Sequence, residues 1–193
     1  HDFLRSDDIT PTTPGSKLRR DNPLRHPQEY PFSHIMKRYK TAVIGCGKRG
    51  KANIRAVGTQ EQLELVALVD PDREAAEAVK TECGNDSLNT YTDHQEMLRQ
   101  EQPDLCVICV WTGLHLPVFR DCAESGARAA FMEKPVAGTW KECREIGDIA
   151  ARTGCRLSIS HQRRFHQGNL NARRMIADGI FGTVIRVDLF SPK

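Results

Sequence analysis

The sequence lacks any long apolar run and any excess of one charge in its larger part. The longest run, Leu105 to Trp111, has seven residues, whereas a membrane-spanning helix needs about 20. Residues 41–193 contain twenty Lys and Arg against twenty Asp and Glu. A nucleic-acid-binding protein needs a basic face. We therefore expect neither a membrane-embedded protein nor a nucleic-acid partner.

A secretory signal is also missing, and the seven cysteines are odd in number. Both features favour reduced thiols and a cytoplasmic protein. Cys106 and Cys109 have C-x-x-C spacing, but they lie in an apolar run typical of a strand. Residues three apart on a strand point to opposite faces. We therefore expect two buried strand cysteines, with no disulfide and no metal site.

The first 35 residues lack apolar periodicity and hold five of the ten prolines. This composition predicts a disordered leader over residues 1–35. The chain starts at His1, and Met36 stands just before a strong strand, so we expect Met36 to be the natural start. Arg19-Arg20 is followed by no apolar stretch, which argues against an export signal.

Residues 36–160 alternate short apolar strands with helices. We expect strands at 39–45, 63–69, 104–110, 128–132 and 155–160, and helices at 51–57, 72–81, 93–100, 115–125 and 139–152. This alternation predicts an α/β fold with a doubly wound parallel sheet, a Rossmann domain. Residues 161–193 are expected to begin a second α/β domain. A further strand, predicted at 183–190, lies close to the end of the chain, so we expect a truncated fragment.

A glycine-rich segment lies between the first predicted strand and the first predicted helix. It fits G-x-G-x-x-G, with Gly45, Cys46, Gly47, Lys48, Arg49 and Gly50. Such a loop presents the helix N-terminus to a pyrophosphate. Asp70 ends the second strand, twenty residues after Gly50, where it can bind ribose hydroxyls and repel a 2′-phosphate. The pattern predicts NAD rather than NADP, although Arg49 and Arg73 could offset the acid.

Methyltransferases share this glycine pattern, so a second motif is needed to choose the chemistry. Glu133-Lys134-Pro135 follows the strand at 128–132 and is therefore expected at the carboxyl edge of the sheet, where ligands bind. Pro135 disfavours helical geometry at Lys134. The ammonium group of Lys134 can bind a substrate oxygen or take part in proton transfer. Taken alone, the tripeptide also fits a solvated turn.

The motifs together, in this order and spacing, resemble the Gfo/Idh/MocA oxidoreductases. These include glucose–fructose oxidoreductase, inositol dehydrogenase and rhizopine-catabolism proteins. The resemblance covers residues 37–193 and rests on 45–50, 70, 107–115, 133–135 and 161–165. It implies an NAD(P)-dependent oxidoreductase acting on a sugar, a polyol or a related carbonyl compound. It implies that Lys134 is catalytic, and it adds further cofactor-binding residues: Thr112, His115, Glu133, Lys134 and Arg163.

Two departures from the family pattern bear on activity. Val110-Trp111 stands where the family usually has Thr-Pro. The family's Asp and His of the second domain lie beyond this chain, so we expect the fragment to be inactive and the full-length protein to be a homo-oligomer. A glycosidase working by transient oxidation and a non-catalytic dinucleotide-binding regulator are the alternatives. The cluster His161, Arg163, Arg164 and His166 is either a solvated turn or the substrate-side rim.

Overall fold

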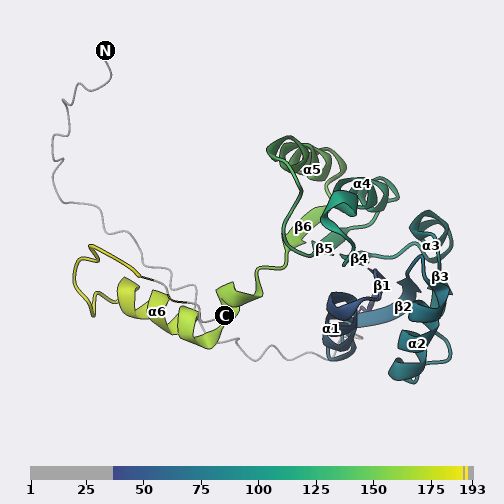
Figure 1. Cartoon of the computed structure of the whole chain (residues 1–193), viewed down its shortest axis with the longest axis horizontal. Coiled ribbons are helices and arrows are strands. Elements are labelled where there is room, and N and C mark those ends of the chain that lie inside the picture. Colours follow the sequence, from purple (N-terminus) through teal and green to yellow (C-terminus); the bar gives the residue numbers. More distant parts are fainter. Residues whose placement is uncertain (1–36, 189, 191–193) are drawn as a thin grey trace, which may run out of the picture. The chain divides into compact units, whose positions relative to one another are not determined.

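The computed structural model describes residues 37–188 and 190, so the predicted leader lies outside the described residues. Six parallel strands form one sheet in the order β3-β2-β1-β4-β5-β6 (Figure 1). This arrangement confirms the predicted doubly wound sheet. The strands are β1 (Tyr39–Ile44), β2 (Leu63–Val69), β3 (Asn89–Tyr91), β4 (Leu105–Ile108), β5 (Ala129–Met132) and β6 (Arg156–Ile159).

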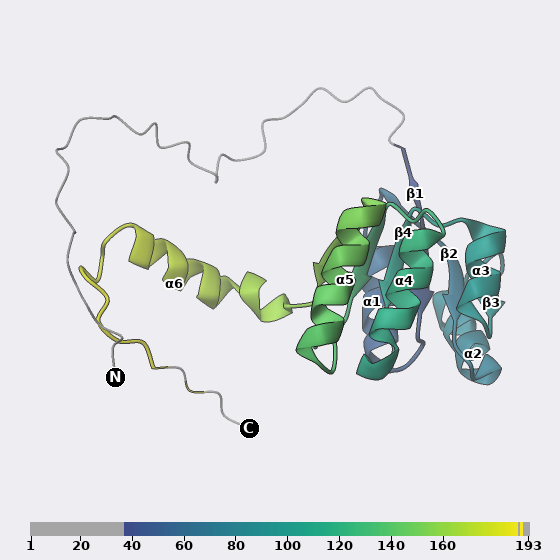
Figure 2. The ribbon, with the colours of Figure 1, turned by 90° about the horizontal axis from the view of Figure 1, so that it is seen from above.

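Helices pack on both faces of the sheet, as Figure 2 shows. Side chains of alternate strand residues form two separate cores. Ala42 and Ile44 face one core with α3, α4 and α5, whereas Val43 and Leu68 face the other with α1 and α2. The main helices are α1 (Lys48–Gly58), α2 (Arg73–Cys83), α3 (His94–Glu101), α4 (His115–Glu124) and α5 (Trp140–Thr153).

Cys106 and Cys109 face different cores, as predicted, but Cys109 is only half-buried and follows β4, so the prediction of two buried strand cysteines is wrong for Cys109. Cys106 belongs to the core under α3, α4 and α5, and Cys109 packs against the core under α1 and α2. All seven cysteines are free thiols. Among the residues that the structure describes, no group of His, Cys, Asp and Glu side chains could hold a metal ion. No helix within 37–188 has both the length and the apolar character needed to cross a membrane.

A turn and a helix follow the sheet. Residues 162–165 form a 3₁₀ turn, η2 (Gln162–Phe165), followed by α6 (Gln167–Ala177). The strand predicted at 183–190 is wrong for its described part, because residues 183–188 are not in a strand. Alternating side chains stabilise a strand only where neighbouring strands supply hydrogen bonds and packing. No side chain of α6 is buried either.

Candidate active site

The carboxyl ends of the strands place the predicted motifs at one edge of the sheet. Chain order reverses between β1 and β4, which are neighbours in the sheet. Ligands of doubly wound proteins bind outside the strands at such a switch point. The glycine-rich loop follows β1, the Thr112 segment follows β4, and Lys134 follows β5. The fold therefore brings the predicted segments to one edge of the sheet, at the switch point where doubly wound proteins have their ligand crevice.

The space around each glycine of the loop shows why a larger residue would not serve there. Gly45 has a φ of +99°, and a Cβ there would lie 2.5 Å from the carbonyl oxygen of Cys109. A Cβ at Gly50 would lie 1.9 Å from the carbonyl oxygen of Gly45. At Gly47, by contrast, a Cβ would meet nothing within 4 Å. Gly45 and Gly50 are thus needed for folding, whereas Gly47 borders open space that a phosphate could enter.

The N-terminus of α1 has no acidic partner of its own. Side chains cap α2, α3 and α5, through Asp72, Asp93 and Thr139 respectively. At α1 the N-cap is Gly47, which makes no side-chain cap hydrogen bond, and the first turn contains no acid. Lys48 and Arg49 stand there instead, although cations are unfavourable at this end of a helix. The uncapped N–H groups and the cation of Lys48 fit a pyrophosphate.

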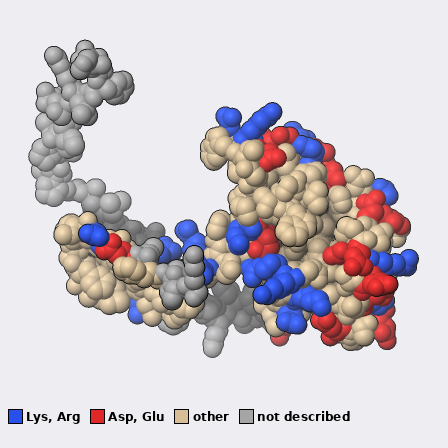
Figure 3. All heavy atoms as spheres, in the orientation of Figure 1, with Lys and Arg blue, Asp and Glu red and all other residues tan. Residues whose placement is uncertain are grey.

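Basic side chains continue along α1. Lys51 and Arg55 follow on later turns of this helix. Figure 3 shows Lys and Arg atoms gathered near α1, and more Asp and Glu atoms toward α2 and α3. The basic side chains are therefore concentrated at α1, in a part of the chain whose charges balance overall.

Asp70 is anchored against the glycine-rich loop. Its Oδ2 accepts a hydrogen bond from the backbone N–H of Cys46 at 2.8 Å, and its Oδ1 accepts one from Asp72 N–H at 3.0 Å. An ionised carboxylate has about four lone-pair sites. Two acceptor sites therefore remain for ribose hydroxyls on a carboxylate whose direction is already fixed.

Cys46 contributes through its backbone rather than its thiol. The residue is buried, and its backbone N–H is donated to Asp70. Burial, together with the negative charge of Asp70, raises the pKa of the Cys46 thiol to about 12. A thiol with that pKa is protonated at neutral pH and is not a nucleophile.

Glu133 forms a buried junction between β5, α1 and β6. Its carboxylate pairs with Arg49 at 3.2 Å and accepts a hydrogen bond from Asn53 Nδ2 at 3.1 Å. Burial raises the pKa of Glu133, but hydrogen bonds from Asn53 and Ser160 and the positive charge of Arg49 outweigh burial, so the pKa is lowered. Glu133 is thus ionised and holds Arg49 and Asn53 of α1 against the loop after β5. No motif in the sequence indicates Asn53, which lies one helical turn after Arg49.

Lys134 is exposed and lines a pocket of about 580 Å³. The pocket draws on three segments that are far apart in the sequence: the first turn of α1, the loop after β5 and the residues after β6. The structure thereby brings the predicted residues Arg49, Lys134 and Arg163 together. The pocket is lined by Arg49, Lys134, Ser160, His161, Gln162, Arg163 and Arg164.

His115, predicted to bind the cofactor, lies inside the fold rather than on its surface. Its side chain is fully buried at the start of α4. Nδ1 lies 3.2 Å from the carbonyl oxygen of Val136, and Nε2 lies 3.1 Å from that of Val110. The imidazole therefore links the loop after β4 to the loop after Pro135. Its contact with a cofactor stays a prediction, as does that of Thr112, which begins the 3₁₀ turn η1 (Thr112–Leu114).

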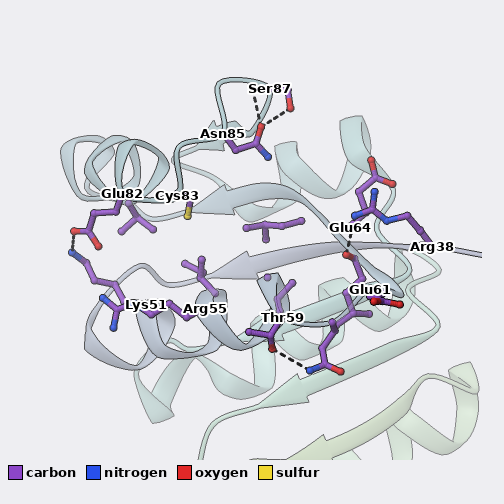
Figure 4. A pocket seen from close by; sticks show the side chains of 17 residues that line it. Arg38, Lys51, Arg55, Thr59, Glu61, Glu64, Glu82, Cys83, Asn85 and Ser87 are labelled. Carbon is purple, nitrogen blue, oxygen red and sulfur yellow. Dashed lines mark hydrogen bonds and ion pairs between the residues drawn. The ribbon is translucent and has the colours of Figure 1, made fainter.

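A larger pocket lies away from these residues. It measures about 720 Å³, and α1, β2 and α2 contribute most of its lining (Figure 4). An ion pair between Lys51 Nζ and Glu82 Oε1, 2.6 Å long, joins α1 to α2 beside it. None of the predicted site residues lines this pocket. The chemistry of the glycine loop and Lys134 therefore points to the crevice at the sheet edge, despite the size of this pocket.

A family profile described as "Oxidoreductase family, NAD-binding Rossmann fold" (GFO_IDH_MocA) matches residues 39–161. The chain belongs to this Gfo/Idh/MocA family. It is 26% identical over 155 residues to the rhizopine catabolism protein MocA of Rhizobium meliloti, covering 80% of this chain and 47% of that protein. It is 31% identical over 148 residues to D-apiose dehydrogenase of Paraburkholderia graminis, covering 77% and 39%.

A solved structure shows the same fold. The WlbA dehydrogenase of Bordetella pertussis, in complex with NADH and UDP-GlcNAcA, superimposes with a TM-score of 0.70 at 26% identity. The match covers 76% of this chain and 44% of that one. The chain therefore spans less than half of the length of these Gfo/Idh/MocA relatives.

Proposed function

We propose that this chain is the NAD-binding part of an oxidoreductase that transfers a hydride between NAD and a sugar, a polyol or a related carbonyl compound. The observation that carries the proposal is the placement of the glycine loop, Asp70 and Lys134 at one sheet edge of a Gfo/Idh/MocA Rossmann fold. Likeness to D-apiose dehydrogenase supports a sugar or polyol as the substrate.

NAD is the proposed cofactor in preference to NADP. The anchored carboxylate of Asp70 would accept ribose hydroxyls and repel a 2′-phosphate. Arg49 could have offset that charge, but it is paired with Glu133. Gly47 and the uncapped start of α1 would hold the pyrophosphate.

Lys134 is the proposed catalytic residue. NAD, when bound, supplies the hydride acceptor. The ammonium group of Lys134 lies exposed after β5 and can donate a hydrogen bond to the substrate oxygen that gains or loses a proton. Glu133 is ionised and buried beside it, so it holds Arg49 rather than moving a proton. Additional proton-transfer groups would come from the second domain, whose start we place at residue 161.

We further propose a reducing, cytoplasmic location and homo-oligomerisation of the full-length protein. Seven unpaired cysteines support the location. Helix α6 buries no side chain among the described residues, and this exposure supports a partner surface beyond the Rossmann part.

Calorimetric titration of this chain with NAD and NADP tests the binding half of the proposal. Tighter binding of NAD is expected, and no binding of either dinucleotide would contradict it. A panel of sugars and glycosides incubated with NAD and the full-length protein tests the chemistry. Net NADH formation identifies a dehydrogenase, sugar release without net NADH identifies the glycosidase alternative, and neither reaction identifies a regulator.

A further inference from the structure

The pocket beside Lys134 is lined by basic and neutral side chains alone. Arg49 enters from α1, Lys134 from the loop after β5, and His161, Arg163 and Arg164 from the segment after β6. None of its lining residues is Asp or Glu. Cations from three separate segments thus converge on one volume of about 580 Å³.

One of these cations is already neutralised. Arg49 pairs with Glu133 at 3.2 Å. With the Gln162 amide oriented to satisfy both of its ends, its oxygen also accepts a hydrogen bond from Arg49 at 3.2 Å. Arg49 is therefore held in place by groups that follow β5 and β6, and its charge is compensated.

The other cations have no such compensation. Across residues 37–188 no carboxylate forms an ion pair with Lys134, Arg163 or Arg164. Three like charges that line one pocket repel one another, and the repulsion falls when an anion enters. Guanidinium groups also match the planar geometry of carboxylates and the oxygens of phosphates.

We propose that this pocket binds an anionic substituent, a carboxylate or a phosphate, on the sugar substrate. The inference rests on the proposed function, because it places the substrate at the Lys134 side of the crevice. The pyrophosphate of NAD has its own site at Gly47 and the start of α1. Lys134, Arg163 and Arg164 are therefore left for a second anion.

The test measures weak binding by NMR chemical-shift titration of the NADH-loaded 193-residue chain. D-glucuronate and glucose 6-phosphate are the two anionic probes, D-glucose is the neutral probe, and inorganic phosphate is the free anion. At least one anionic sugar is expected to bind about tenfold more tightly than D-glucose, because a charge-assisted hydrogen bond contributes roughly that factor. The stronger of the two shows which anion the pocket prefers.

Arg164→Ala is expected to reduce the affinity for the preferred anionic sugar about tenfold. The matched control is Arg173→Ala, an exposed arginine on α6 that does not line the pocket, and it should leave that affinity unchanged. NAD affinity is measured for every variant, so that loss of the fold is recognised.

Three results would overturn the inference. Equal affinities for D-glucose and the anionic sugars, or no binding of any of them, would identify a solvated basic turn. Binding of inorganic phosphate as tight as that of glucose 6-phosphate would exclude a sugar site. Anion binding that is seen in a parallel titration of the NADH-free chain but is lost in the NADH-loaded chain would assign the pocket to the cofactor. Failure of NAD itself to bind would instead contradict the proposed function.

Discussion

At the scale of single residues, Asp70 accepts a hydrogen bond from the glycine loop and is also the residue proposed to select NAD over NADP. We predict that Asp70→Ala lowers NAD affinity by ten- to hundredfold and NADP affinity much less, because a charge-assisted hydrogen bond contributes roughly 1.5–3 kcal/mol. Calorimetric titration of both dinucleotides measures the effect. Asp72→Ala, which removes an exposed acid that caps α2, is the matched control and should keep the preference. Equal affinities in the unmodified chain would contradict the assignment.

Glu133 gives a prediction about pH at the same scale. Its pKa is lowered below the ordinary value of 4.5 in the folded chain. A lowered pKa stabilises the fold at pH values above the unfolded pKa, and this stabilisation is lost as pH falls through the folded pKa. Glu133→Gln should therefore lower the free energy of unfolding by about 1–3 kcal/mol at pH 7, with a shrinking difference from the unmodified chain below pH 4.5.

Urea denaturation at pH 7 and at lower pH measures that difference. Glu82→Gln is the control, because Glu82 pairs with Lys51 at an exposed position and exposed ion pairs contribute little to stability. A pH-independent difference for Glu133→Gln would show that packing, rather than the charge of the carboxylate, sets its contribution.

At the scale of elements, sequence patterns predicted the helices and strands whose ends are set by neighbouring residues. The helix predicted at 139–152 is α5, which begins with a capping box of Thr139 and Glu142, and β2 has the predicted bounds. The predicted strand at 104–110 ends earlier, at Ile108. Beyond it the chain turns, and the carbonyl of Cys109 packs against Gly45. Contacts between distant segments decide such an end, and sequence periodicity does not report them.

The same distinction applies to the site. The glycines, Asp70 and Lys134 were predictable because each follows a recognisable strand. The bond from Asn53 to Glu133 spans α1 and β5, so no local pattern indicates it. The burial of His115 between two backbone carbonyls is likewise set by the tertiary fold. The prediction of a strand was wrong at 183–188 for a related reason: the side chains alternate there, but no neighbouring strand pairs with these residues.

The glycine loop supplies a prediction with two opposite outcomes. Gly50→Ala places a Cβ 1.9 Å from the carbonyl oxygen of Gly45, so it should lower the free energy of unfolding by about 1–3 kcal/mol. Gly47→Ala meets nothing within 4 Å, so it should leave stability unchanged but weaken NAD binding by obstructing the pyrophosphate. Denaturation and NAD titration of both variants are the measurements.

Gly58→Ala, at the far end of α1 and also free of neighbours within 4 Å, is the control for this pair: it should leave NAD binding unchanged and should not lower stability, because alanine is favourable in a helix. A loss of stability in Gly47→Ala equal to that in Gly50→Ala would mean that both glycines serve folding alone.

At the scale of the whole molecule, the composition of residues 1–35 predicts that they add nothing to stability, because they offer no apolar face to bury. A chain starting at Met36 should melt at the same temperature as the 193-residue chain within error. Differential scanning calorimetry of both chains measures this. A lower melting temperature for the shorter chain would show that the first 35 residues dock on the fold.

The division of chemistry between this chain and the rest of its protein gives the last prediction. The glycine loop, Asp70 and Lys134 all lie within residues 45–134, so NAD should bind here. Hydride transfer also needs the substrate carbon held against the nicotinamide and a base within hydrogen-bond reach of the hydroxyl.

Segment 161–188 offers mostly exposed side chains for that purpose. The 193-residue chain should therefore show no sugar-dependent NADH formation at 340 nm. In the full-length protein, Lys134→Ala should lower kcat by at least about a hundredfold while changing NAD affinity little, because general acid–base catalysis contributes about 10²–10⁴-fold. Formation of NADH by the isolated chain would show that Lys134 and the residues lining its pocket suffice for the reaction.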